Sequence, residues 1–314
     1  MEISFFTTNE FEGYRLDCVV AIKASGYSRS LIAQHIKNGD ILVSGRTRKP
    51  SYKVQAGEVV SGFIKEAQNR VGIINGSDNN DNIEPKFDII HEDSQIVVIN
   101  KRSSVVVHPA PGNASGTLVS ALITYSPQIR YVGEDPLRPG IVHRLDRDTS
   151  GVMVIAKDEQ SFHFLKKEFM QRRVEKRYIA LVSGIIKEDS GKIIIPIGRH
   201  PIKRKMMSTL AENGRYAETL WQVKNRYQDA TLVEAELKTG RTHQVRVHFK
   251  AIGHPLVGDS LYGFKKGKKT IRFHQKKRQM LHAWKLSFRH PWSGKRVEFT
   301  APLPDDMEEF IDYI

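Results

Sequence analysis

Short apolar runs, separated by polar turns, recur along the chain after residue 86. Runs of this length are typical of β-strands, because helices usually need ten or more residues. One helix interrupts them where Asp158 can cap a segment whose Phe162, Leu165 and Phe169 repeat at helical spacing. We therefore expect a mixed sheet with helices, and we place strands at residues 96–99, 105–107, 152–156, 178–182, 193–195 and 233–237.

The N-terminal segment has a pattern of its own. Residues 15–25 are typical of one helix, and a second runs from Ser28 to Lys37, where Asn38-Gly39 can close it in a left-handed conformation. Residues 40–43 then have the apolar character of a strand. The pattern predicts a small separate domain over residues 1–65.

Residues 66–85 are the best candidate for a linker. The stretch 75–82 contains only asparagine, glycine, serine and aspartate, which favour turns and cannot supply a core. We predict that this hinge ends at Pro85 and that a second domain occupies residues 86–314.

Composition is that of a globular protein. The 314 residues are 39% hydrophobic and 27% charged, enough for one large core and a small satellite domain. No stretch approaches the roughly 20 apolar residues that cross a bilayer, and the N-terminus lacks the order of a secretory signal. Cys18 is the only cysteine, so no intramolecular disulfide is expected. We expect a cytoplasmic protein without membrane contact.

Positive charge is concentrated in one part of the chain. Residues 201–300 hold 22 lysines and arginines against 7 aspartates and glutamates, so this part has an excess of 22 − 7 = 15 positive charges. The net charge of the whole chain is +14, so the rest of the chain is close to neutral. Such an excess favours a polyanionic partner whose affinity falls steeply with salt. The densest clusters lie at residues 203–205, 265–269 and 276–278. For residues 265–269 a solvated lysine loop is an equal alternative.

A carboxylate among arginines marks the first candidate for chemistry. In the run from Gly140 to Gly151, GIVHRLDRDTSG, Asp146 lies between Arg144 and Arg147. Nearby positive charge favours the anionic form of an aspartate, so Asp146 should be able to act as a nucleophile or base at neutral pH. A charged turn between two elements is the alternative.

A second motif, LKTGRTHQVRVH at residues 237–248, leaves a predicted strand and enters a predicted helix. Thr242 can cap this helix, apolar residues follow at helical spacing, and Gly253 can end it. Arg246 then lies in the first turns, where the core can hold its side chain against a carboxylate across a cleft. An unpaired surface arginine is the alternative.

The histidines of these motifs do not have the spacing of a metal site. His243 and His248 are five residues apart, so they share neither a helix face nor a strand face, and no HExxH pattern occurs. Asp146 and Asp148 lie among arginines, which disfavour a bound cation. The chain also lacks a glycine-rich nucleotide loop, and we predict neither a metal nor a cofactor.

The HRLDRDTSG run at residues 143–151 resembles the HRLD-x-x-TSG signature of the RluA-type RNA pseudouridine synthases. The resemblance implies that Asp146 is the catalytic residue and that Arg246 orients it. Tyr178, in a segment similar to the family's K-x-Y-x-A strand, would lie against the target base. Further similar segments at residues 107–109 and 253–263 extend the resemblance over nearly the whole chain.

One departure from the family is clear. Members usually have Asn-Lys-Pro-x-Gly where this chain continues from Asn100-Lys101 with Arg102-Ser103-Ser104, so a turn-forming proline and glycine are missing. This leaves the shape of that loop open.

The resemblance also implies an α+β fold, in which a mixed, largely antiparallel sheet of the pseudouridine synthase type forms the catalytic domain. The N-terminal segment is similar to the RNA-binding module of the small-subunit ribosomal protein S-four type, a small α/β domain. The resemblance is carried, in this order, by Arg15-Leu16-Asp17, Ser28-Arg29-Ser30, Ile36-Lys37-Asn38-Gly39, Val43-Ser44-Gly45 and Ala56-Gly57-Glu58. That module binds RNA through its second helix and the following turn, which implies binding by Arg29, Lys37, Arg46, Arg48 and Lys49. A domain that only packs on its neighbour is the alternative.

We expect an isomerase that converts specific uridines of structured RNA to pseudouridine without a cofactor. Large-subunit ribosomal RNA is favoured as the partner, tRNA is possible, and we expect a monomer. RNA contacts near the site are expected from His143, Arg144 and Arg241, with Arg144 able to fill the gap left by an extruded nucleotide. The alternatives are a non-catalytic RNA-binding or ribosome-assembly factor, a tRNA-directed pseudouridine synthase and a metal-dependent nuclease.

Overall fold

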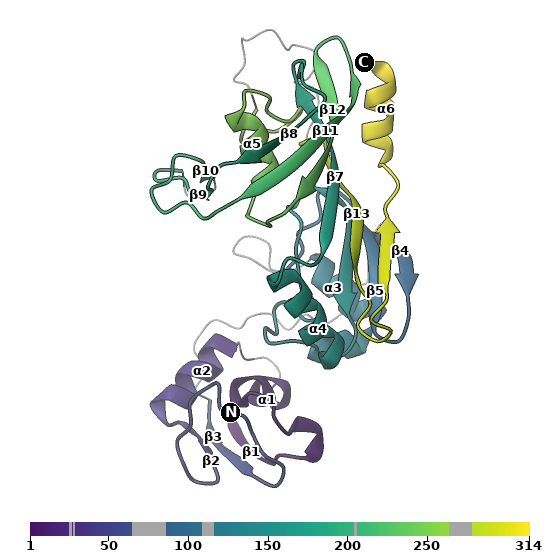
Figure 1. Cartoon of the computed structure of the whole chain (residues 1–314). Coiled ribbons are helices and arrows are strands. Elements are labelled where there is room, and N and C mark those ends of the chain that lie inside the picture. Colours follow the sequence, from purple (N-terminus) through teal and green to yellow (C-terminus); the bar gives the residue numbers. More distant parts are fainter. Residues whose placement is uncertain (25–26, 28, 65–85, 109–115, 204–205, 264–277) are drawn as a thin grey trace. The chain divides into compact units, whose positions relative to one another are not determined.

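Figure 1 shows the computed structural model, which describes residues 1–24, 27, 29–64, 86–108, 116–203, 206–263 and 278–314. The chain divides into two compact units. The first comprises the described residues within 1–83, 108–115 and 119–140, and the second those within 84–107, 116–118 and 141–314. The linker predicted at residues 66–85 lies outside the described residues, so the domain boundaries set around it stay a prediction.

The first unit contains a three-stranded antiparallel sheet in the order β1-β3-β2. Both helices predicted from the sequence are present beside it, and Gly39 has the left-handed φ of 80° expected after the second. Its core joins apolar side chains of these helices and strands, among them Leu16, Ile32 and Val60. The elements are β1 (Glu2–Phe6), η1 (Asn9–Phe11), α1 (Leu16–Lys23), α2 (Arg29–Asn38), β2 (Ile41–Val43) and β3 (Val59–Phe63), with η2 (Pro127–Tyr131) and all of α3 (Leu118–Tyr125) except Leu118 in the same unit.

The second unit is built on a mixed sheet. In the described part of the chain its strand order is β4-β5-β6-β13-β7-β12-β11-β8, with β14 paired to β13. The β6–β13 pair is parallel and the other pairs are antiparallel, which confirms the largely antiparallel α+β architecture. The strands are β4 (Phe87–Glu92), β5 (Ile96–Lys101), β6 (Ser150–Ala156), β7 (Glu175–Ser183), β8 (Ser190–Ile194), β11 (Glu218–Arg226), β12 (Ala230–Leu237), β13 (Leu281–Arg289) and β14 (Arg296–Thr300).

The described residues of this unit also form three helices and a small pair of strands. They are α4 (Glu159–Met170), α5 (Gln244–Ala251), α6 (Asp305–Tyr313) and the paired strands β9 (Gly198–Arg199) and β10 (Met207–Ser208). The start of α4 is as predicted, because the Asp158 carboxylate accepts the N–H of Ser161 at 2.8 Å. Among the described residues, no helix has both the length and the apolar character needed to cross a membrane.

The strand predicted at residues 105–107 is wrong. The chain turns there, with Ser104 in the left-handed region at φ 65°. The carbonyl of Val105 accepts from Lys101 Nζ, and that of Val106 accepts from the N–H of Leu118. These partners replace the ladder of a strand, so the short apolar run forms part of a turn.

Gly151 is required where β6 meets β13 next to the HRLD motif. It has φ 121°, and a Cβ at this position would lie 2.2 Å from the carbonyl oxygen of Ala283. Because that obstacle is backbone of the paired strand, we expect Gly151→Ala to lower the free energy of unfolding by about 3 kcal/mol or more. Urea unfolding measures this value. Gly240→Ala is the matched control, since a Cβ there meets nothing within 4 Å, and an equal loss in both variants would contradict the explanation.

Candidate active site

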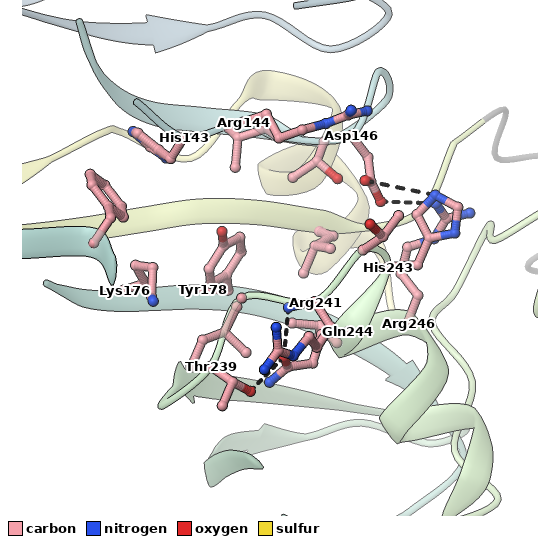
Figure 2. A pocket seen from close by; sticks show the side chains of 18 of the residues that line it. His143, Arg144, Asp146, Lys176, Tyr178, Thr239, Arg241, His243, Gln244 and Arg246 are labelled. Atoms are coloured by element: carbon pink, nitrogen blue, oxygen red, sulfur yellow. Dashed lines mark hydrogen bonds and ion pairs between the residues drawn. The ribbon is translucent and has the colours of Figure 1, made fainter. Parts of the chain in front are cut away.

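A cavity of about 580 Å³ lies in the second unit where three segments distant in sequence meet (Figure 2). One is the motif loop at residues 142–149, the next runs from the end of α4 into β7, and the third joins β12 to α5. The cavity is lined by Asp146, Tyr178 and Arg246, the three residues to which the sequence analysis assigned chemistry.

Arg246 joins two carboxylates. Its Nη1 donates to Asp146 Oδ2 at 3.0 Å, while its Nε and Nη2 donate to Asp259 Oδ2 and Oδ1 at 2.7 and 2.9 Å. The side chains of Arg246 and Asp259 are 5% and 0% exposed, whereas that of Asp146 is 19% exposed. Asp259 therefore fixes the guanidinium from behind, and the guanidinium fixes Asp146 at the cavity wall.

The guanidinium stays charged in this setting. Burial alone would lower the pKa of Arg246, but the hydrogen bonds and charges of Asp259 and Asp146 outweigh it and raise the pKa above its ordinary value. Asp259 is held in turn by the backbone N–H groups of Leu261 and Tyr262, which donate to its Oδ1 at 2.9 and 3.0 Å. Sequence analysis gave Asp259 no role, although it lies in the segment 253–263 that resembles the family.

The helix that carries Arg246 begins later than predicted. Its N-cap is His243, with φ 57° and ψ 22°, and not Thr242. Gln244 explains the difference, because its Oε1 accepts the N–H of Arg241 at 3.0 Å and the hydroxyl of Thr239 at 2.7 Å. The buried amide thus shapes the loop before α5, a role that no sequence pattern indicated.

The ring of His243 is oriented by a buried tyrosine. Tyr262 Oη accepts the N–H of Met207 at 2.7 Å and lies 2.8 Å from His243 Nδ1, to which its own proton can be donated. A neutral imidazole then carries its proton on Nε2, which is 3.8 Å from Asp146 Oδ1. Burial lowers the pKa of His243, outweighs the opposing charge of Asp146 and favours this neutral form.

Tyr178 lies on β7 between two small cross-strand neighbours, Ala235 of β12 and Ala283 of β13. Figure 2 shows its hydroxyl directed toward the loop that carries Asp146. Burial and, second, the negative charge of Asp146 raise the pKa of Tyr178. The hydroxyl therefore keeps its proton at neutral and moderately basic pH.

Buried polar groups hold the loop after Asp146 from behind. The carbonyl of Arg147 accepts from Lys101 Nζ at 3.0 Å, and the carbonyl of Asp148 accepts from Arg278 Nη1 at 3.2 Å. The Thr149 hydroxyl accepts from Gln279 Nε2 at 3.2 Å. Lys101 is 0% exposed, and burial lowers its pKa to about 7.

Arg278 extends this support to the last helix. Its Nε and Nη2 donate to the two carboxylate oxygens of Asp306 on α6, both at 2.6 Å. The side chain of Arg278 is 7% exposed. One buried guanidinium therefore connects the loop after Asp146 with the C-terminal helix.

Comparisons with known proteins agree with this geometry. A family model described as RNA pseudouridylate synthase matches residues 95–251, and a model of the S4 domain matches residues 15–60. An uncharacterized RNA pseudouridine synthase of Bacillus subtilis, YlyB, is 40% identical over 99% of this chain and 97% of its own length. The chain belongs to the RNA pseudouridylate synthase family.

Other members of the family are similar in sequence and in fold. Ribosomal large subunit pseudouridine synthase D of Neisseria meningitidis serogroup A is 38% identical over 97% of this chain and 80% of its own length. A solved structure, human RNA Pseudouridylate Synthase Domain Containing 1, matches with a TM-score of 0.57 at 27% identity, over 73% of this chain and 94% of that one. The chain is thus an RNA pseudouridine synthase, which is an isomerase, and the resemblance drawn from its motifs is confirmed.

The three RNA-binding residues predicted near the synthase site all line the cavity. Arg144 is exposed. His143 stacks on Phe169 with ring centroids 4.5 Å apart, and burial lowers its pKa to about 3, so its ring is neutral. Arg241 donates from Nε to the carbonyl of Tyr216 at 3.1 Å. Their part in RNA binding stays a prediction.

The residues predicted to bind RNA in the synthase's first unit are partly brought together. Lys37, Arg48 and Lys49 line one surface depression, where the Arg48 guanidinium lies 4.6 Å from the centre of the Tyr52 ring. Arg46 does not line it. Arg29 begins α2, but its side chain lies outside the described part of the chain.

His248, whose spacing argued against a metal site, and His254 both have other partners in the synthase. His248 is 2.9 Å from the Thr219 hydroxyl and 3.0 Å from the Ile195 carbonyl. His254 is 3.0 Å from the carbonyl of Ser183. Within the described ranges, no three histidine, cysteine, aspartate or glutamate side chains form a group that could hold a metal ion.

Proposed function

We propose that this RNA pseudouridine synthase acts on uridines of large-subunit ribosomal RNA and that Asp146 is its catalytic residue. The observation that carries the proposal is the Asp146 carboxylate, held 3.0 Å from a buried Arg246 at the wall of a cavity. A nucleotide extruded from its stack needs such a cavity. Relatives named ribosomal large subunit pseudouridine synthase D, which match nearly the whole chain, support the choice of RNA.

The reaction requires one protein side chain that acts directly on the nucleoside. The bond from ribose C1′ to base N1 breaks, the base turns, C1′ joins C5, the C5 proton leaves and N1 takes up a proton, so that nothing is oxidised or reduced. Arg246 binds Asp146 Oδ2 and leaves Oδ1 for the nucleotide. That oxygen can attack C1′ or remove a proton from the ribose, and both routes remain open.

Tyr178 is proposed to stack on the uracil and to handle a proton through its hydroxyl. We therefore expect Tyr178→Phe to lower kcat by about 10²-fold or more, the usual contribution of a positioned acid or base, and to leave KM nearly unchanged because the ring remains. Single-turnover and steady-state measurements separate the two constants. If KM rises while kcat is kept, Tyr178 contributes only to binding.

The RNA contacts that we propose extend beyond the reacting nucleotide. They comprise Arg144 in the gap left by the extruded base, His143 and Arg241 beside it, and the cations of the N-terminal module, which spans residues 1–65 ahead of a linker at 66–85 and the synthase domain at 86–314. The match of the S4 domain model to residues 15–60 supports this use of the N-terminal module. We further propose a cytoplasmic monomer, which size measurement in solution can test.

The experiment is to map pseudouridines in total RNA with and without the gene, and to repeat the modification with purified protein on ribosomal RNA and tRNA transcripts. We expect sites to be lost from large-subunit ribosomal RNA and to be restored in vitro. If pseudouridine sites are lost from tRNA alone, the substrate is tRNA and the proposed ribosomal RNA substrate is wrong. Unchanged pseudouridine in every RNA would favour an assembly factor without turnover.

A further inference from the structure

The cationic side chains that line the cavity include Arg172, Lys176, Arg215 and Arg241. In the described part of the chain, none of the four has an ion pair with an acidic side chain. This differs from Arg246, whose charge is matched by two carboxylates in the same cavity. These four side chains therefore bring positive charge to the cavity that no acidic side chain of the described residues pairs with.

These cations are also crowded. Burial and the charge of Arg172 lower the pKa of Lys176 to about 8. Burial, then Arg215 and Arg172, lower the pKa of Arg241. Positive groups that oppose one another's charge and lack an acid are stabilised when an anion enters between them.

The position of Lys176 indicates the kind of anion that fits this part of the cavity. Lys176 and Tyr178 are two residues apart on β7, so both face the cavity, whereas Arg177 between them pairs with Glu234 on β12. Two residues of a strand span roughly 6.6 Å. A nucleotide whose base stacks on Tyr178 carries its own phosphate at a comparable reach from the base.

We propose that Lys176, with Arg172 beside it, binds a phosphodiester group that flanks the target uridine. The subsite anchors the nucleotide on the side of the cavity away from the Asp146–Arg246 pair, as Figure 2 shows for the labelled Lys176. The inference rests on the proposed RNA substrate and adds the group by which the target nucleotide is held.

A double-mutant cycle between protein and RNA tests the contact. Lys176→Gln is compared with wild type on an RNA fragment that wild type modifies, with a neutral methylphosphonate at the linkage 5′ or 3′ to the target uridine. We expect Lys176→Gln to raise KM about tenfold. One of the two methylphosphonates should raise the KM of wild type similarly and leave that of Lys176→Gln unchanged. Additive effects, or a wild-type KM for Lys176→Gln, would overturn the proposal.

Two controls separate this inference from the proposed function. Lys192→Gln, at an exposed lysine of β8 outside the cavity, should behave as wild type. Binding of RNA without turnover is measured as a function of salt, and the slope should fall by about one charge in Lys176→Gln only. An unchanged slope contradicts the phosphate contact, whereas absent turnover in wild type with a changed slope contradicts only the proposed reaction.

A pH series gives an independent readout. The groups that face Lys176 are Arg172 after α4 and the neutral ring of His143, so Lys176 loses its own charge as pH rises through about 8. The KM of wild type should rise by up to about tenfold between pH 7 and pH 9. Lys176→Arg keeps its charge in this range and should show a flat profile. A rise in KM that is equally steep in both proteins would contradict the assignment of this pH dependence to Lys176.

Discussion

Asp146→Asn is expected to abolish pseudouridine formation, lowering tritium release from RNA labelled at uracil C5 by roughly 10⁴-fold or more. An amide has nearly the same shape as a carboxylate and can still lie against Arg246, but it can neither attack C1′ nor take a proton. The affinity for RNA should change little, because phosphate contacts dominate binding. Tritium release and filter binding measure the two effects.

Asp148→Asn is the matched control for this variant. It removes a carboxylate from the same loop, two residues further on, where the side chain lies 3.7 Å from Arg147 and outside the cavity lining. Its turnover should stay close to that of wild type, and EDTA should not change the activity of either protein. Normal turnover by Asp146→Asn would assign the chemistry to another residue.

Arg246→Gln is expected to lower both activity and stability. The substitution leaves Asp259 fully buried without its guanidinium partner, and an unpaired buried charge costs about 3–5 kcal/mol of the free energy of unfolding. It also frees Asp146 from its orienting bond, so kcat should fall by about 10²-fold or more. Urea unfolding and single-turnover kinetics measure these losses.

Asp259→Asn separates the effect of Arg246 on stability from its effect on turnover. It disturbs the buried pair but leaves the guanidinium beside Asp146, so it should lose stability while keeping more turnover than Arg246→Gln. Arg246→Lys keeps a positive charge but loses the forked geometry that binds two carboxylates. Its turnover should lie between those of Arg246→Gln and Asp259→Asn. Equal turnover in Arg246→Gln and wild type would contradict the orienting role.

How far the sequence predicted this site depends on the kind of signal each residue carries. Asp146, Tyr178 and Arg246 lie in motifs with specific residue types at fixed spacing, and the structure places all three on one cavity. Lys101 was missed because its partners are backbone carbonyls, and Gln244 because backbone groups are among its partners. Every residue has such groups, so no pairing can be inferred from composition or spacing.

The fold shows the same division. The apolar runs of β6 and β12 predicted strands, since burial on both faces leaves a short continuous apolar run and burial on one face leaves an alternation. The run at residues 105–107 was too short to distinguish a strand from a buried turn. The strand β13 was not predicted, although its parallel contact with β6 and antiparallel contact with β7 place it at the centre of the sheet.

The bridge from Asp148 through Arg278 to Asp306 has a consequence for biosynthesis. During translation, the loop after Asp146 emerges from the ribosome some 160 residues before its last support does, because Asp306 lies on α6. A nascent chain therefore cannot complete this support until synthesis has passed residue 306. Partly made protein therefore has Asp146 without the finished support of its loop, and we expect it to modify RNA only after α6 has been made.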